Sequence, residues 1–231
     1  FDGITYAKGA SVLKQLVHYV GRENFYAGAR DYFQEHAFGA ATFDDLLKAL
    51  KKHTDRDLDA WSTAWLRTWG PDTLTPELHT DGDKIHELAI TVDAEDTTRP
   101  HRLNVALFDN SLAKYATLDV DLASERTILD EVSGLQAPAL LLLNDGDHTY
   151  AKVALTDEDG LQAAIEGVST LESALSRGLI WGSLWENVRD ARLPVTTYVD
   201  AVVRNVSKEP SASLLGTMVN NAQVAIATFS A

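Results

Sequence analysis

The apolar positions of residues 1–70 recur every three or four residues, which is the period of an amphipathic helix. The apolar face of the first predicted helix consists of Tyr6, Ala10, Leu13, Leu16, Val17 and Val20. Gly21 ends this helix, and a second helix is expected from Glu23 to about His36. Its apolar face consists of Phe25, Ala29, Tyr32 and Phe33. The chain is therefore predicted to begin with a group of helices.

Capping residues mark two further helices in this group. Thr42 is a candidate N-cap, and Asp44 and Asp45 stand in the following turn, where the helix dipole favours acidic side chains. A fourth helix is expected to start near Asp57 and to end at Gly70-Pro71, a C-cap glycine followed by proline. These signals place the end of the helical group at about residue 71.

Three tryptophans lie four residues apart in the fourth predicted helix. They are Trp61, Trp65 and Trp69. The spacing places them on one helix face, which favours a ridge of core packing. A surface on which a substrate stacks is the less favoured alternative.

From residue 73 to residue 154 the pattern changes to short alternating segments separated by turn residues, which predicts strands. The predicted strands are Leu74–Thr80, Lys84–Val92, Leu103–Phe108, Tyr115–Leu122, Thr127–Val132, Ala139–Leu143 and Tyr150–Leu155. Asp81-Gly82-Asp83 is a candidate hairpin turn. The run Leu140 to Leu143 is expected to be buried on both faces or covered by a neighbouring domain. Short strands at regular spacing predict a small β-sandwich.

The helical period returns at Thr156. The first apolar face here consists of Leu161, Ala164, Ile165, Val168 and Leu171. Further helices are expected over Ala174–Arg189, Val195–Asn205 and Leu214–Phe229. The predicted fold class is therefore multidomain α+β, with boundaries at residues 1–71, 72–155 and 156–231.

Composition narrows the class of protein. The 231 residues are 45% hydrophobic and 23% charged, and no apolar run reaches the ~20 residues of a membrane span. The net charge of −14 would repel a phosphate backbone, so neither a membrane nor a nucleic acid is expected as a partner. The absence of cysteine excludes disulfides and thiolate chemistry and is compatible with a reducing compartment, so we expect a cytoplasmic location. Because the chain starts at Phe1 with a helix almost at once, we expect a processed protein or a piece of a longer one.

Candidate metal and catalytic motifs are few. No two histidines are four residues apart, and His86-Glu87-Leu88-Ala89-Ile90 lacks a second histidine and alternates like a strand. Asn144-Asp145-Gly146-Asp147 has some calcium-loop character, but His148 and the residues after it do not continue the pattern, so a tight turn is favoured. No G-x-S-x-G, phosphate-binding loop or dinucleotide fingerprint is present in the sequence.

Tyr6 is the one candidate catalytic residue. The segment Tyr6-Ala7-Lys8-Gly9-Ala10 resembles the Y-E-K-G-A segment of the zinc aminopeptidase N family, with Ala7 where many members carry Glu. In that family the tyrosine stabilises the tetrahedral intermediate. A neutral phenol is a hydrogen-bond donor at pH 7, so Tyr6 is able to stabilise an oxyanion.

Three further stretches resemble the same family, in the same order along the chain. They are Trp65–Pro71 at the end of the catalytic domain, Asn144–Val153 as the last hairpin of the sandwich, and Arg177–Trp185 with Arg189-Asp190 as the opening of the helical domain. The resemblance implies that residues 1–71 are the C-terminal helical part of a thermolysin-like catalytic peptidase domain. It also implies that residues 72–155 are a β-sandwich and residues 156–231 the first helices of a C-terminal helical domain.

The resemblance implies a metallo-aminopeptidase that removes N-terminal amino acids from peptides with a free N-terminus. The whole enzyme would bind Zn²⁺ through an HExxH motif and a further Glu and would activate a water molecule. This chain contains none of those ligands, so by itself we expect it to bind no zinc and to be inactive. The alternative is a non-enzymatic interaction module of a β-sandwich and helices, in which Tyr6 is only a core residue.

Overall fold

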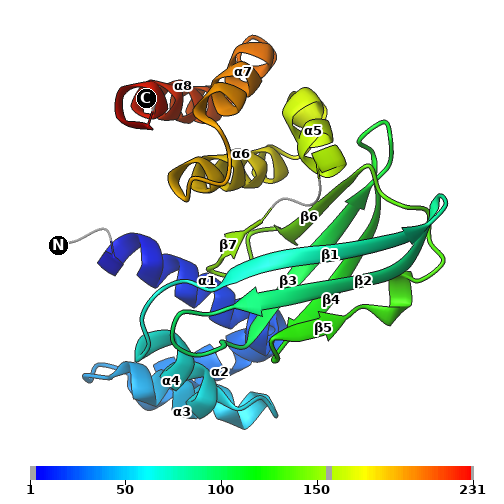
Figure 1. Cartoon of the computed structure of the whole chain (residues 1–231). Coiled ribbons are helices and arrows are strands. Elements are labelled where there is room, and N and C mark those ends of the chain that lie inside the picture. The colour runs from blue at the N-terminus through cyan, green and yellow to red at the C-terminus, as the bar shows by residue number, and fades with distance from the viewer. Residues whose placement is uncertain (1–3, 155–157, 230–231) are drawn as a thin grey trace.

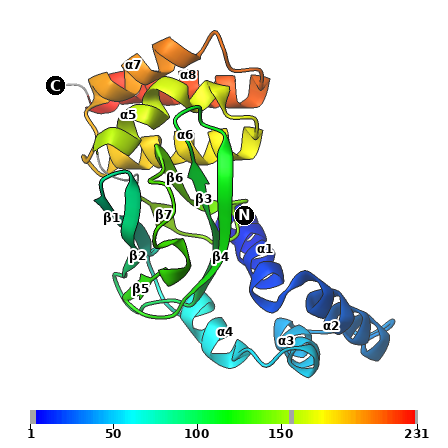
Figure 2. The ribbon, with the colours of Figure 1, turned by 90° about the vertical axis from the view of Figure 1, so that its right-hand side faces the viewer.

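The structure, a computed structural model, describes residues 4–154 and 158–229. A group of helices comes first in the chain, a β-sandwich follows, and a second group of helices ends it (Figure 1). Figure 2 shows the second group stacked on one end of the sandwich, while the first group extends from the opposite end. The predicted α+β class with helices on both sides of a sandwich is confirmed.

The first helical group has a small core of its own. Its elements are the π-helical turn η1 (Ile4–Lys8), α1 (Gly9–Val20), α2 (Arg22–Glu35), α3 (Phe43–Leu50), the 3₁₀ turn η2 (Lys51–His53) and α4 (Leu58–Leu66). Thr42 is the N-cap of α3, as predicted, and it also forms a reciprocal capping box with Asp45. Asp57 caps α4 by accepting hydrogen bonds from the backbone N–H groups of Asp59 and Ala60. The buried apolar side chains are Val12, Leu16, Tyr19, Val20, Leu47, Leu50, Leu58, Trp61 and Trp65.

The predicted apolar face of α1 is only partly correct. Leu16 and Val20 are buried, but the side chain of Leu13 is 45% exposed and that of Tyr6 is 69% exposed. Val12 and Tyr19 are buried instead. The helical period alone did not show which of the apolar stripes would meet the core, because that choice depends on where the neighbouring elements lie.

Two other aromatic predictions are wrong for local reasons. Trp69 is 64% exposed, because α4 ends at Leu66 and the tryptophan stripe does not continue beyond the helix. Phe33 is 71% exposed, and the buried residue of α2 is Gly28. Gly28 lets α2 approach α3 so closely that a Cβ atom there would lie 2.8 Å from Leu50 Cα.

The described strands form two antiparallel-rich sheets packed face to face. The strands are β1 (Thr73–Asp81), β2 (Lys84–Asp93), β3 (His101–Phe108), β4 (Lys114–Leu122), β5 (Arg126–Ile128), β6 (Leu140–Asp145) and β7 (Lys152–Val153). One sheet has the order β5-β2-β1-β7 and the other β4-β3-β6, with β7 parallel to β1. The predicted hairpin is confirmed: Asp81 pairs with Lys84 across Gly82, whose φ is 60°. The predicted strand Thr127–Val132 is shorter, since Asp130–Val132 forms the 3₁₀ turn η3.

Strand β6 connects two cores, as the run of leucines predicted. Leu141 and Leu143 pack in the interior of the sandwich. Leu140 and Leu142, which point to the opposite face, pack against the second helical group. Figure 1 shows α5 and α6 lying over this part of the sheet.

The second helical group consists of α5 (Glu158–Gly167), the 3₁₀ turn η4 (Val168–Thr170), α6 (Ala174–Arg189), α7 (Val195–Asn205) and α8 (Ala212–Phe229). A buried ion pair joins Arg177 of α6 to Glu209, with Nε–Oε2 and Nη2–Oε1 distances of 2.9 and 3.0 Å. The predicted boundary between residues 155 and 156, and Leu155 itself, lie outside the described residues. Within residues 4–154 and 158–229, no helix combines the length and the hydropathy needed to cross a membrane.

Candidate active site and its supporting junction

Tyr6 lies in the π-helical turn that precedes α1. Its side chain is 69% exposed. A π-helical turn is rare and often occurs at functional sites. The N-terminal end of α1 lies on the side of the sandwich where β7 and α6 are found (Figures 1 and 2).

An apolar groove of about 590 Å³ adjoins α1 on the side of α3 and α4. It is lined by Lys8, Gly9, Val12, Leu13, Phe43, Leu46, Trp61, Trp65 and Leu66. Leu13, Phe43 and Leu66 are among the large apolar side chains that the described structure leaves exposed. The groove begins two residues after Tyr6, on the same helical segment.

A more polar cleft of about 480 Å³ lies between α1, the segment from β6 to β7, and α6. Ser11 of α1 forms one wall, and Tyr150 and Lys152 form another. Gly182 and Arg189 line it from α6. The cleft therefore brings together residues more than 170 positions apart in the sequence.

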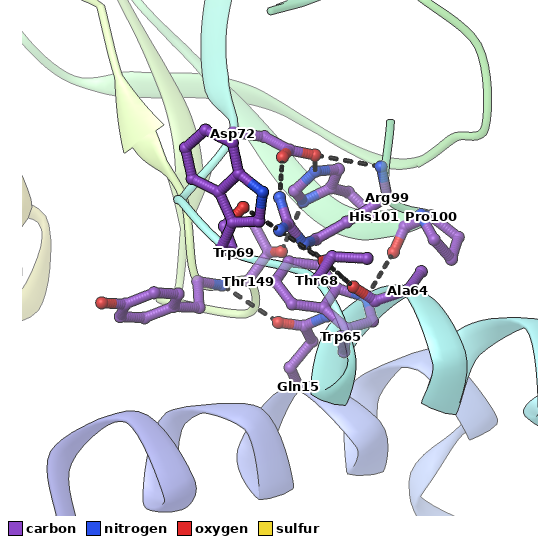
Figure 3. Close-up of polar contacts among 11 residues, drawn as sticks. Gln15, Ala64, Trp65, Thr68, Trp69, Asp72, Arg99, Pro100, His101 and Thr149 are labelled. Carbon is purple, nitrogen blue, oxygen red and sulfur yellow. Dashed lines mark hydrogen bonds and ion pairs between the residues drawn. The ribbon is translucent and has the colours of Figure 1, made fainter. Parts of the chain in front are cut away.

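A buried polar cluster connects α4 to the sandwich directly behind this region (Figure 3). Its centre is Asp72, whose side chain is fully buried and forms an ion pair with Arg99. Asp72 Oδ2 also accepts hydrogen bonds from the backbone N–H of Arg99 at 3.0 Å and from His101 Nε2 at 2.9 Å. His101 Nδ1 lies 2.7 Å from Thr149 Oγ1. The cluster thus joins the α4–β1 connection to β3 and to the segment after β6.

Arg99 fastens the same cluster to the end of α4. Its guanidinium group donates to the carbonyl oxygens of Ala64 and Trp69, at 3.1 and 2.7 Å, and to Thr68 Oγ1 at 2.6 Å. It also lies over the ring of Trp65, 5.5 Å from the ring centroid. A side chain that donates to three backbone or hydroxyl oxygens and pairs with a carboxylate has little freedom to move.

The electrostatics of Asp72 reflect two opposing effects. Burial by itself would raise the pKa of the Asp72 carboxyl. The hydrogen bonds from His101 and from the Arg99 backbone, together with the positive charge of Arg99, outweigh burial and hold that pKa below its ordinary value. Asp72 is therefore ionised at neutral pH, and the cluster is a buried ion pair rather than a neutral network.

A turn after β6 holds α1 against the sandwich. Lys14 Nζ donates to the carbonyl oxygen of Gly146 at 3.1 Å and to Asp147 Oδ2 at 2.9 Å. The backbone N–H of Tyr150 donates to Oε1 of the buried Gln15 at 3.1 Å (Figure 3). These contacts join residues more than 130 positions apart, so they fix the first helical group relative to the sandwich.

A histidine pair lies beside that turn. The rings of His18 and His148 stack with their centroids 3.8 Å apart and an interplanar angle of 10°. Burial lowers the pKa of His18, although Asp119, 3.4 Å from its Nε2, acts in the opposite direction. Burial and the nearby charges of His18 and Lys14 lower the pKa of His148. Both rings are therefore favoured in the neutral form.

Comparisons with known proteins identify the family. Residues 1–65 match the peptidase family M1 domain, and residues 140–231 match the ERAP1-like C-terminal domain. Aminopeptidase N of Streptomyces lividans is 41% identical over 245 aligned residues, which include 100% of this chain and 28% of that protein. The chain belongs to the M1 peptidase family.

Two less similar relatives also align with most of this chain. Aminopeptidase N of Lactococcus lactis is 27% identical over 87% of this chain and 23% of its own length. Tricorn protease-interacting factor F2 of Thermoplasma volcanium is 25% identical over 90% of this chain and 25% of its own length. The chain thus spans about a quarter of the length of the relatives it matches.

The matches place the features of the structure within the M1 family. Tyr6 and its helix lie in the part matched by the M1 peptidase domain. Strands β6 and β7, with the turn that contacts α1, lie in the part matched by the C-terminal domain. The contacts of Lys14 and Gln15 therefore run between the two matched regions.

The described residues do not fit a metal site. No group of three or more His, Asp or Glu side chains that could hold a metal ion occurs among them. The segment around His86-Glu87 lies in β2, as the alternation predicted, and Glu87 pairs with Arg126 at 2.6 Å.

The sequence did not indicate the cluster of Asp72, Arg99 and His101. Asp72 is 27 residues from Arg99 and 29 from His101, so no local motif relates them. The clue that was available is the Arg99-Pro100-His101 segment directly before a buried strand, where charged residues are rarely buried without partners. The ion pair of Arg177 and Glu209 was not indicated by a local motif either, because the two residues are 32 positions apart.

Proposed function

We propose that the whole protein is a zinc-dependent M1 aminopeptidase and that this chain contributes Tyr6 to its active site. The substrates on this proposal are peptides with a free N-terminus, from which the enzyme removes the first amino acid. The observation that carries the proposal is a largely exposed tyrosine side chain in the turn directly before α1, inside the part of the chain that matches the M1 peptidase domain. The similarity to an aminopeptidase N over the whole chain supports it.

The role of Tyr6 follows from the chemistry of peptide hydrolysis. When water attacks the scissile carbonyl, negative charge develops on the carbonyl oxygen. A neutral phenol donates one hydrogen bond to such an oxyanion and loses no proton in doing so. A donor that is already placed before the reaction stabilises the transition state more than the ground state, so its loss lowers kcat more than it changes KM.

Zinc enters the proposal through the family, whose members use this metal. On this proposal its ligands, and the Glu that activates water, belong to the part of the protein outside this chain. Zinc supplies Lewis-acid stabilisation of the substrate carbonyl and a reactive water in such enzymes. The 231-residue chain alone is accordingly expected to show no peptidase activity.

The apolar groove beside α1 is consistent with residues 1–71 forming part of a larger catalytic domain. Leu13, Phe43 and Leu66 leave a groove that contains few polar groups for solvent to hydrate. On our proposal, the remainder of the M1 catalytic domain packs in this groove and completes the surroundings of Tyr6.

The test is Tyr6→Phe in the full-length protein, assayed on an aminoacyl anilide. Removing one oxyanion donor is expected to lower kcat about 10²–10³-fold while KM changes little. Tyr26→Phe is the matched control, because Tyr26 is also exposed and lies in the same matched domain, on α2. An unchanged kcat in Tyr6→Phe would exclude Tyr6 from the chemistry.

A further inference from the structure

A polar stripe of α1 faces the sandwich, distinct from the stripe that faces the helical core. Its residues follow one another at spacings of three and four. They are Lys8, Ser11, Gln15 and His18. Lys8 lies over the ring of Tyr150 at 5.9 Å, Gln15 accepts from the Tyr150 N–H, and His18 stacks on His148. The neighbouring Lys14 adds its contacts to Gly146 and Asp147. The same short segment after β6 therefore contacts Lys8 at the end of η1 and the part of α1 from Lys14 to His18.

That segment is rigid because of its own hydrogen bonds. Asn144 adopts a positive φ of 60°, and its Oδ1 accepts from the backbone N–H groups of His148 and Thr149 at 2.7 and 2.9 Å. Its Nδ2 donates to the carbonyl oxygen of Thr149 at 2.9 Å. The N–H of Asp147 closes the turn on the Asn144 carbonyl at 2.8 Å. A buried Asn that uses both ends of its side chain in this way fixes the backbone around it.

The segment is also anchored on its other side. Thr149 is buried, and its hydroxyl group lies 2.7 Å from His101, which donates to Asp72. The turn is thus held between the buried ion pair of Asp72 and Arg99 and the polar stripe of α1 (Figure 3). Displacement of α1 along its axis would break contacts with a structure that is fixed elsewhere.

Tyr6 needs such support. It lies at the start of the helical segment and 69% of its side chain is exposed, so packing around the ring alone does little to hold it. An oxyanion donor acts only when it is about 2.7–3.1 Å from the oxyanion, and a misplacement of about 1 Å is able to cost 10²-fold in rate. The contacts that fix α1 therefore bear directly on the rate.

We propose that the 144–150 turn of the sandwich positions Tyr6 by clamping α1, with Lys14 and Asp147 as positioning residues for the reaction. This inference rests on the proposed role of Tyr6. Lys14 and Asp147 touch neither the substrate nor the reacting atoms, and they act through the placement of α1. A half-exposed ion pair contributes little to stability, so its removal leaves the chain folded.

The first experiment measures hydrogen exchange of the 231-residue chain. Lys14→Met is expected to speed amide exchange in residues 9–13 of α1 several-fold and to leave α2 and α3 unchanged. Lys48→Met, which removes an exposed lysine on α3, is the matched control. Exchange in α1 that is the same in Lys14→Met as in the parent chain overturns the clamp, whatever the role of Tyr6.

The second experiment is a double-mutant cycle on kcat in the full-length protein, with Tyr6→Phe as the second substitution. Lys14→Met is expected to lower kcat about tenfold, less than for a 1 Å misplacement, and to have no effect once Tyr6 is Phe. Asp147→Asn should behave in the same way, and Lys14→Arg should restore most of the rate. KM should change little in each variant.

The outcomes separate the two proposals. An equal loss of kcat from Lys14→Met in both backgrounds means that Lys14 does not act through Tyr6, which overturns the positioning role while the function of Tyr6 stands. Unchanged kcat in Tyr6→Phe alone removes the proposed function and, with it, any positioning of a catalytic group. A loss confined to the background that retains Tyr6, together with faster exchange in α1, supports both.

Discussion

A single charged residue, Asp72, illustrates how the chain joins its parts. A fully buried carboxylate is costly unless its oxygens are paired, and here both are. One oxygen meets the guanidinium of Arg99, and the other accepts from the Arg99 backbone and from His101. The pair adds less to net stability than its geometry suggests, because desolvation offsets much of the Coulomb attraction. The ion pair instead fixes the orientation of the segments it joins, since few other arrangements give hydrogen-bond partners to Asp72, Arg99 and His101 together.

Breaking this pair has a much larger expected effect than its net contribution. Asp72→Asn leaves Arg99 charged, buried and unpaired, so we expect the free energy of unfolding to fall by about 3–5 kcal/mol. Urea unfolding of the 231-residue chain measures it. The matched control is Asp121→Asn, which breaks the more exposed pair with Arg56 and should cost about 0–1 kcal/mol. Equal losses in the two variants would show that the burial of Asp72 is not what matters.

At the scale of elements, local sequence predicted most bounds well. The expected helices Ala174–Arg189 and Val195–Asn205 have those bounds in the structure, and the capping box at Thr42 is present. The consecutive leucines of β6 are buried on both faces, as the continuous run predicted, and they divide between two cores. In each case the information lies in adjacent residues: periodicity, a cap or a turn.

What the sequence did not reveal depends on distant partners. The helical period gave α1 several stripes of apolar and small residues, and only the packing of other elements decides which is buried. Tyr6 shares the apolar period of that face, but it lies in η1 before α1 and its side chain is 69% exposed. The clamp on Lys14 and Gln15 joins residues more than 130 positions apart, which no local pattern encodes. The identity of the candidate catalytic residue came from the Tyr6-to-Ala10 motif alone, and its role stays a prediction.

The contact between α2 and α3 gives a prediction at this scale. A Cβ atom on Gly28 would lie 2.8 Å from both Cα and Cδ2 of Leu50, and the backbone atom has little room to yield. Gly28→Ala should therefore lower the free energy of unfolding by about 1–3 kcal/mol, although alanine favours the helix. Gly9→Ala is the matched control, because a Cβ at Gly9 meets no atom within 4 Å. Thermal unfolding measures both, and a stabilised Gly28→Ala variant would contradict the close approach.

At the scale of the whole molecule, polar contacts join the first helical group to the sandwich. Lys14 pairs with Asp147, Arg56 with Asp121, and Trp65 Nε1 donates to the Pro100 carbonyl at 3.1 Å. The second helical group is attached through the apolar face of β6, and the ion pair of Lys152 with Asp190 at 2.8 Å and the hydrogen bond from Ser176 to Asp145 at 2.7 Å add polar contacts there. Imidazole rings occur at the first of these two junctions, and their protonation makes it respond to pH near neutrality.

The histidine pair makes this response testable. His18 and His148 stack between α1 and the turn after β6. The charged groups that act on them are Asp119, Asp121, Asp147, Arg102 and Lys14. Folding lowers the pKa of both histidines, so at mildly acidic pH these two rings bind more protons in the unfolded chain than in the folded chain. Stability from these rings is therefore fully present above about pH 6.5, the ordinary pKa of histidine, and is lost as the pH falls through the lowered pKa values of the two rings. Carboxylates such as Asp119, whose pKa is also lowered, lose their contribution only at lower pH.

His148→Phe isolates this effect, because it keeps a ring for stacking and removes one proton site. The free energy of unfolding, measured by urea at pH 7, 6 and 5, should fall less steeply with decreasing pH in the variant than in the parent chain. The substitution could also change the free energy of unfolding by the same amount at all three pH values. Such a change does not alter the dependence on pH, which is the quantity compared. His79→Phe, at an exposed histidine of β1, gives the change in slope that the loss of any surface histidine causes. If His148→Phe and the parent chain have the same slope, folding does not hold His148 neutral, and the junction between α1 and the sandwich is not the acid-sensitive part of the molecule.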